Sequence, residues 1–261
     1  TVKARVKGDA QNHGAIEARL RVRVYDGRDQ LSDIDGQTVA VQPGSEAVLE
    51  WTLPDTGGQP IAEIGIVVTG TGRRADGKLL VDYLRWDGTP KLTLKRPAGD
   101  GDFWRMAWVN GASFFSKRFK AAFRIAQNRG EGMIIHGTRQ WTDYQASGDV
   151  MIHLGNYGGL AIRAQGLRRY YGARVTRDGK MQIVKVRDED TKVLAETAFK
   201  MEFDKHIAMK VSAQGPRITF EADGVSVTAE DTSADALHDG GVGLLIHEGA
   251  LSSNEIRIGG V

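Results

Sequence analysis

The stretch "GGLAIRAQGLRRYYGARVTRDGK", residues 158–180, decides the fold class of this chain. Apolar side chains alternate with polar ones along it, which is the pattern of β-strands whose two faces meet different surroundings. The Asp-Gly pair at 178–179 is the strongest short signal for a hairpin turn. The stretch therefore predicts antiparallel strands joined by tight turns.

The same alternation continues in both directions from this stretch. Runs such as "EARLRVRVYDG" at 17–27 and "HIAMKVSAQG" at 206–215 resemble strands, and 33 glycines against 6 prolines suit many tight turns. The aperiodic segment "KRPAGDGD" at 95–102 interrupts the pattern. We therefore predict an all-β protein with two antiparallel β-sandwich (jelly-roll) domains in tandem, at 1–96 and 102–261, joined near Pro97.

Composition and charge narrow the function classes. The formal net charge is +2, so no strong basic field favours nucleic acid as a partner. The chain has no cysteine, which excludes disulfides, thiolate nucleophiles and zinc sites built from cysteine. No apolar run approaches the roughly 18 residues of a membrane-spanning helix. The start "TVKARVKGDA" is not a signal peptide and opens in a strand, so we expect the chain to belong to a larger protein.

Four further motifs follow the same order as strands of a known fold. They are "WTDYQASGDV" at 141–150, "KVLAETAF" at 192–199, "MKVSAQGPRITFEADG" at 209–224 and "GGVGLLIHEGALSSNEIRI" at 240–258. Together with 158–180 they make the region 102–261 resemble the concanavalin A-like, laminin-G-like jelly roll. The resemblance implies a β-sandwich of the kind that often binds carbohydrate.

Two further resemblances concern the parent protein and the first domain. The motifs "FWRMAWVNG" at 103–111 and "GTRQWTDY" at 137–144 resemble the accessory C-terminal region of some bacterial proteins related to ADP-ribosylglycohydrolases. That resemblance implies a catalytic domain elsewhere in the parent chain, because the family's helical domain with its acidic metal motifs is absent here.

The first domain is similar to galactose-binding-like β-sandwich modules through "IAEIGIVVTGTG" at 61–72 and "GKLLVDYLRWDG" at 77–88. Such modules usually run longer, so the front of this one is expected to be incomplete. They often hold a structural Ca²⁺, and Asp82 matches a position that frequently serves as its ligand. The resemblance thus implies a metal role for Asp82, against the alternative of a salt-bridged surface carboxylate.

Catalytic patterns are scarce. The one dense acidic stretch, "RDEDTKVLAE" at 187–196, falls at an expected hairpin and points carboxylates to both faces, so it is interpreted as a solvated loop. The alginate-lyase version of the fold uses a Gln-Ile-His strand, and "MIIHG" at 133–137 has the histidine without the glutamine. No acid–base pair on one strand face emerges, which favours a non-catalytic protein.

A ligand face is predicted from the period of two along the strands. In "RRYYGARV", Tyr171, Ala173 and Val175 form the apolar side and leave Tyr170 and Arg174 opposite. The outward side chains expected to gather into a ligand site are Arg163, Gln165, Tyr170, His153, His136 and Arg169. Aromatic rings cover the apolar faces of sugars, and arginine guanidinium groups bind hydroxyls or carboxylates. The ligand is therefore expected to be a carbohydrate, and the arginines favour an acidic or phosphorylated one.

The sequence thus predicts a non-catalytic carbohydrate-binding accessory region of a larger bacterial protein. Two alternatives stay open: a polysaccharide lyase or glycoside hydrolase, which Arg163 and Tyr170 keep in view, and a protein-interaction or structural β-sandwich module. An extracellular or cell-surface location is favoured.

Overall fold

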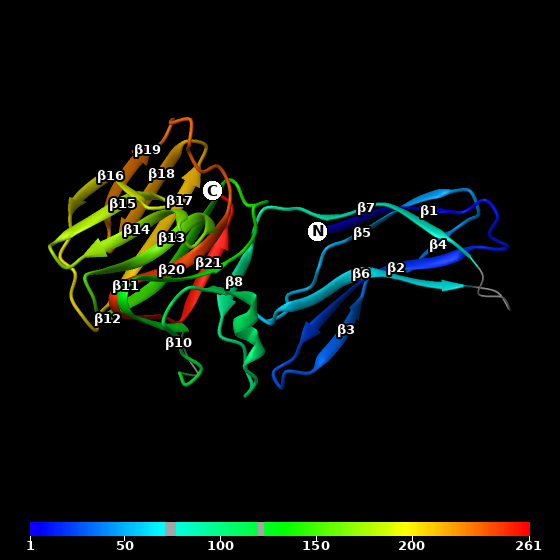
Figure 1. The fold of residues 1–261 in the computed structure, drawn as a ribbon, viewed down its shortest axis with the longest axis horizontal. Coiled ribbons are helices and arrows are strands. Elements are labelled where there is room, and N and C mark those ends of the chain that lie inside the picture. The colour runs from blue at the N-terminus through cyan, green and yellow to red at the C-terminus, as the bar shows by residue number, and fades with distance from the viewer. Residues whose placement is uncertain (71–76, 120–122) are drawn as a thin grey trace. The chain divides into compact units, whose positions relative to one another are not determined.

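A computed structural model describes residues 1–70, 77–119 and 123–261 (Figure 1). The regular elements in these ranges are antiparallel strands and one short 3₁₀ helix, η1 (Phe103–Ala107), so the predicted all-β fold class is confirmed. The chain forms two compact units. Unit 1 comprises Thr1–Gly88 with Gly99–Trp104, and unit 2 comprises Thr89–Ala98 with Arg105–Val261.

Unit 1 contains two sheets. In one, β1 (Val2–Gly8) pairs with β5 (Glu46–Trp51) and β7 (Leu79–Trp86). In the other, β2 (Ile16–Tyr25) pairs with β3 (Leu31–Asp35), β4 (Val39–Val41) and β6 (Ile61–Gly70). Both sheets contribute to one apolar cluster, to which Ala4 and Leu20 belong. The strict alternation of β2 follows from this packing, because every second side chain is buried there and the arginines between them remain partly exposed.

Unit 2 is built on one continuous hydrogen-bonded sheet that folds over into two layers. The first layer runs in the order β16 (Asp190–Ala198), β15 (Lys180–Arg187), β14 (Arg169–Thr176), β13 (Tyr157–Gly166), β20 (Gly241–Ser253) and β11 (Phe123–His136). The second runs β19 (Val225–Glu230), β18 (Arg217–Ala222), β17 (His206–Gln214), β12 (Tyr144–Leu154), β21 (Glu255–Gly259) and β8 (Leu92–Lys95). Two short strands, β9 (Val109–Asn110) and β10 (Phe114–Phe115), pair with β11.

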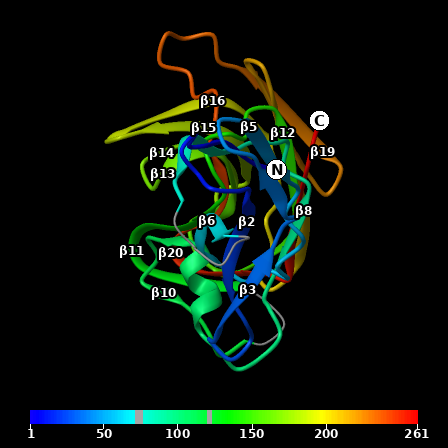
Figure 2. The same cartoon turned by 90° about the vertical axis from the view of Figure 1, so that its right-hand side faces the viewer.

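The two layers pack face to face through alternate side chains. A Cβ placed on Gly158 of β13 would lie 3.2 Å from Ile152 of β12, so this side of the first layer faces the second layer. Ile162 and its cross-strand partner Tyr171 lie on that inner side and are buried. The strands of both layers are seen from another side in Figure 2.

The opposite side of the first layer, called here the outer face, is also partly apolar. It carries a buried cluster that includes Met133, Tyr170, Val184 and Leu245 from four different strands. If the outer side of the layer met only solvent, the alternation of apolar and polar side chains would place polar residues there, so such a cluster is not predicted. The outer face therefore combines an apolar floor with the polar side chains described below.

The strand β8 lies before the predicted domain boundary but belongs to unit 2. Its residues Leu92–Lys95 pair with β21, from Leu92 opposite Ile258 to Lys95 opposite Glu255. Leu94 is accordingly buried. The structure thus differs from the expected range of 1–96 for the first domain, because this segment completes its hydrogen bonds in the second sheet layer.

In the ranges that the structure describes, no helix combines the length and the hydropathy needed to span a bilayer.

Candidate functional site

A row of polar side chains crosses the outer face of the first layer. Arg174 of β14 lies opposite Gln182 of β15, which lies opposite Glu196 of β16. Arg174 Nε donates to Gln182 Oε1 at 3.0 Å, and Gln182 Nε2 donates to Glu196 Oε2 at 2.8 Å. Lys180 Nζ reaches the other Glu196 oxygen at 2.7 Å. Together with Tyr157 of β13, these side chains are called the outer polar row.

Tyr157 anchors one end of the outer polar row. The Arg174 guanidinium lies 4.0 Å from the centroid of the Tyr157 ring, and the His247 ring lies 4.7 Å from it at a tilt of 34°. Burial and the neighbouring Glu131 carboxylate raise the pKa of the Tyr157 hydroxyl, so it stays protonated near neutrality. The stack therefore presents a fixed guanidinium and a phenol that can donate a hydrogen bond.

An open pocket of about 550 Å³ lies over this end of the row. Its lining residues are Asn156, Tyr157, Arg174, Thr176, Arg177, Asp178 and Gln182. The Thr176 hydroxyl holds the pKa of Asp178 below its ordinary value, and Lys180 does the same for Glu196, so both carboxyls remain ionised acceptors. The pocket thus offers donors and acceptors side by side, which matches ligands with several hydroxyl groups.

Sequence reasoning placed Arg174 on the correct side of its strand but did not select it, and it missed Tyr157 and Gln182. The available signal was the alternation "RYYGARV" continued through the "DG" hairpin into "KMQIV". Carrying the register across that turn places Arg174 beside Gln182.

The prediction that Arg163 points outward is wrong. Its exposed fraction is 2%, and its backbone φ of 49° lies in the left-handed region. The pairing of β13 with both neighbours shifts register here, so the bulge turns Arg163 inward. Its guanidinium donates to the carbonyl oxygens of Thr142, Gly215 and Leu237 and to the Asp143 carboxylate, at 2.8–3.1 Å. Arg163 therefore joins loops at one end of the sandwich.

Tyr170 lies on the predicted side of β14 but is not exposed. Its ring is fully buried in the apolar cluster of the outer face, and its hydroxyl donates to Glu131. Desolvation raises the pKa of this hydroxyl, and the Glu131 carboxylate raises it further. The residue forms part of the floor beneath the outer polar row.

Gln165 and Arg169 do come together, at a smaller pocket of about 230 Å³ that also includes Arg139 and Arg187. The Gln165 amide donates to the Asp239 backbone and side chain at 3.2 and 3.0 Å. Arg169 forms a two-armed ion pair with Asp188, with both distances 2.9 Å. We place the candidate site at the larger pocket, which lies beside the Tyr157–Arg174 stack.

The two predicted histidines lie in separate environments. His136 Nδ1 is 2.8 Å from the Ala107 carbonyl oxygen, and its ring packs between Trp108 and Trp141. Desolvation lowers the pKa of His136, which keeps the imidazole neutral. His153 contacts Asp204 and Ser252 on the second layer. The six predicted residues therefore do not form one site.

The metal prediction for Asp82 concerns unit 1. Asp82 is exposed on β7 and lies 3.7 Å from the Arg5 guanidinium. Across the described part of the chain, no group of three or more histidine, aspartate or glutamate residues is arranged to hold a metal ion. Asp82 as a Ca²⁺ ligand stays a prediction.

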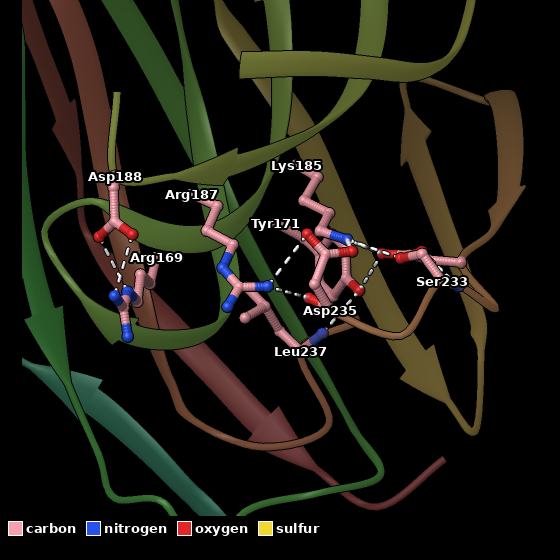
Figure 3. A network of polar contacts seen from close by, with 9 residues as sticks. Arg169, Tyr171, Lys185, Arg187, Asp188, Ser233, Asp235 and Leu237 are labelled. Carbon is pink, nitrogen blue, oxygen red and sulfur yellow. Dashed lines mark hydrogen bonds and ion pairs between the residues drawn. The ribbon is translucent and has the colours of Figure 1, made fainter. Parts of the chain in front are cut away.

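A second polar network lies inside unit 2 (Figure 3). Lys185 Nζ is 2.9 Å from the Asp231 carboxylate and 2.7 Å from Asp235, and the side-chain exposures of Lys185 and Asp231 are only 7% and 6%. Tyr171 donates to Asp231 at 2.7 Å, and Ser233 also bonds to it. Figure 3 shows these groups converging, whereas the Arg169–Asp188 pair lies apart from them.

This network predicts loss of stability in acid. Burial, the largest single influence, favours the neutral form of Asp231, but hydrogen bonds from Ser233, Tyr171 and Lys185 outweigh it and lower the pKa to about 2 from 3.8. A lowered carboxyl pKa contributes stability above the unfolded value and loses it as pH falls through the folded value. We expect the urea midpoint of unit 2 to drop between about pH 4 and pH 2. Asp231→Asn should flatten this dependence, and an unchanged slope would contradict it.

The comparisons with known proteins concern the fold. No protein-family model and no curated protein matches the sequence. The carbohydrate-binding module CBM66 from Bacillus subtilis matches with a TM-score of 0.51 and 18% identity over 59% of this chain and 95% of that chain. A Bacillus subtilis protein of unknown function with a galectin-like fold matches with a TM-score of 0.51 and 11% identity over 67% and 97%. The chain thus shares a β-sandwich fold with these two structures.

Proposed function

We propose that unit 2 binds carbohydrate at the pocket beside the outer polar row, as an accessory region of a larger bacterial protein that is non-catalytic toward the glycan it binds. The observation that carries the proposal is the arrangement of Tyr157, Arg174 and Gln182 in an open pocket, with the guanidinium held over the ring. Hydroxyl groups of a sugar would meet the alternating donors and acceptors of this row. The catalytic domain would lie elsewhere in the parent chain.

The two arginines of the pocket favour an acidic glycan. Arg174 and Arg177 line it together with one carboxylate, Asp178, whereas Glu131 and Glu248 are engaged by Tyr157 and Asn156 at its edge. A guanidinium accepts a carboxylate or phosphate with two parallel hydrogen bonds. The likeness of the fold to the carbohydrate-binding module CBM66 supports the ligand class.

Replacing Arg174 by alanine is expected to weaken glycan binding by about 10- to 100-fold, because a charge-assisted contact and the support of the Tyr157 ring are lost together. Isothermal titration with neutral and uronic-acid oligosaccharides measures the effect. Arg169→Ala, which changes an arginine outside the larger pocket, serves as the matched control and should bind normally. Equal affinities for wild type and Arg174→Ala would contradict this site.

A further inference from the structure

A hydrogen-bonded series joins His153 of β12 to Ser252 of β20 and to Asp204, which precedes β17. His153 Nδ1 is 2.6 Å from Asp204 Oδ1, and His153 Nε2 is 2.9 Å from Ser252 Oγ. A carboxylate accepts hydrogen bonds, so Nδ1 donates to Asp204, and in the neutral imidazole Nε2 then accepts from the Ser252 hydroxyl. This is the tautomer and the order of contacts that a serine nucleophile, its base and an orienting carboxylate require.

The backbone holds the series from two directions. The pairing of β12 with β20 shifts register between Ile152 and Leu154, so His153 occupies a bulge, a device that re-aims side chains next to active sites. The Asp204 amide donates to the Ile152 carbonyl oxygen at 2.9 Å, and Asp204 adopts a φ of 58°. Imidazole and carboxylate are therefore positioned by main-chain contacts rather than by flexible side chains alone.

A positive group neighbours the serine. Arg124 of β11 lies directly opposite Ser252 of β20, and cross-strand partners project to the same face. The Arg124 guanidinium lies 4.3 Å from the centroid of the Phe119 ring. The series is open to solvent at its acidic end, because the Asp204 side chain is 70% exposed, and Ser252 is itself partly exposed. Ser252 is therefore a partly exposed hydroxyl that contacts a base and has an arginine at its cross-strand position.

We propose that Ser252, His153 and Asp204 form a hydrolytic site for short acyl esters, distinct from the glycan pocket and independent of it. Ser252 Oγ bonds to the ester carbonyl carbon while its proton passes to His153 Nε2. The carbon–alkoxy bond then breaks, and the departing oxygen takes that proton. Water repeats the sequence on the acyl-serine and releases the carboxylic acid. Arg124 stabilises the oxyanion, and Asp204 acts as a positioning residue.

The test uses the full chain, a fluorophosphonate probe and p-nitrophenyl acetate. We expect the probe to label Ser252, located by mass spectrometry, and ester hydrolysis to fall to the buffer rate in Ser252→Ala. Ser147→Ala changes a different serine, which lies on β12 and is also partly exposed, and this variant should retain both signals. No labelling of the wild type, or labelling and hydrolysis that persist in Ser252→Ala, would overturn the proposal.

The positioning role of Asp204 has its own readout. Asp204→Asn should lower the hydrolysis rate at neutral pH by roughly tenfold or more, because an amide no longer enforces the Nδ1–H tautomer. Asp204→Glu should recover part of the rate, and the thermal midpoints of all three proteins should agree. Full activity in Asp204→Asn would show that the carboxylate does not act through His153.

Discussion

Replacing Arg163 by alanine is expected to lower the free energy of unfolding of unit 2 by about 3–5 kcal/mol. The guanidinium is almost fully buried and serves three backbone carbonyl oxygens, from Thr142, Gly215 and Leu237, as well as Asp143. Truncation removes the donor from the buried Leu237 carbonyl oxygen, where an unpaired acceptor costs about 1–3 kcal/mol, and from the part-buried contacts to Thr142 and Gly215. It also separates the loops that Arg163 joins.

Urea titration of the full chain measures this loss, with hydrogen exchange of the β13 and β14 amides assigning the transition to unit 2. Arg169→Ala is the matched control, because its ion pair with Asp188 lies on the surface and should contribute at most about 1 kcal/mol. Arg163→Lys should remain strongly destabilised, since an ammonium cannot serve the same fork of acceptors. A loss in Arg163→Ala no larger than in Arg169→Ala would refute the anchoring role.

Lys185→Ala is expected to produce a loss of similar size, about 3–5 kcal/mol, for an electrostatic reason. Removing the ammonium leaves the Asp231 carboxylate buried with the hydroxyls of Tyr171 and Ser233 and the Ser233 amide as its remaining partners. Burial is the largest single influence on Lys185 and lowers its pKa. The hydrogen bonds that Lys185 donates to Asp235 and Asp231, together with the attraction of these carboxylates, outweigh burial and raise the pKa, so the pair stays charged across the neutral range.

Two variants separate charge from packing at this position. Lys185→Met keeps most of the side-chain volume, so it should be nearly as destabilised as Lys185→Ala if the unpaired Asp231 charge dominates. Arg187→Met removes the more exposed partner of Asp235 and should cost at most about 1 kcal/mol. Urea titration compares the stabilities of these variants, and hydrogen exchange again assigns the transition to unit 2. Wild-type stability in Lys185→Met would show that the ion pair contributes little.

The strand alternation predicted one face of β14 correctly. Tyr171, Ala173 and Val175 are buried on the inner side, as the period of two requires. The same reasoning failed on β13 because the chain bulges at Arg163, and nothing in "AIRAQG" marks a left-handed residue there. One extra residue in a strand reverses the side to which the following residues point.

The surroundings of the candidate site were less predictable, because strands that are distant in sequence bury the residues beneath it. Alternation gives the side on which Tyr170 lies, but Met133 and Leu245, far away in sequence, help to bury it. Likewise Ser252, His153 and Asp204 come from β20, β12 and a loop, and no local motif links them. Pairings across long sequence separations decide both features.

The central claim is glycan recognition by the outer polar row. A glycan array probed with wild type, Arg174→Ala and Arg169→Ala tests it most directly. We predict that wild type binds a set of glycans enriched in acidic sugars, that Arg169→Ala binds the same set, and that Arg174→Ala loses it. An array without wild-type signals, or signals that survive in Arg174→Ala, would contradict the account.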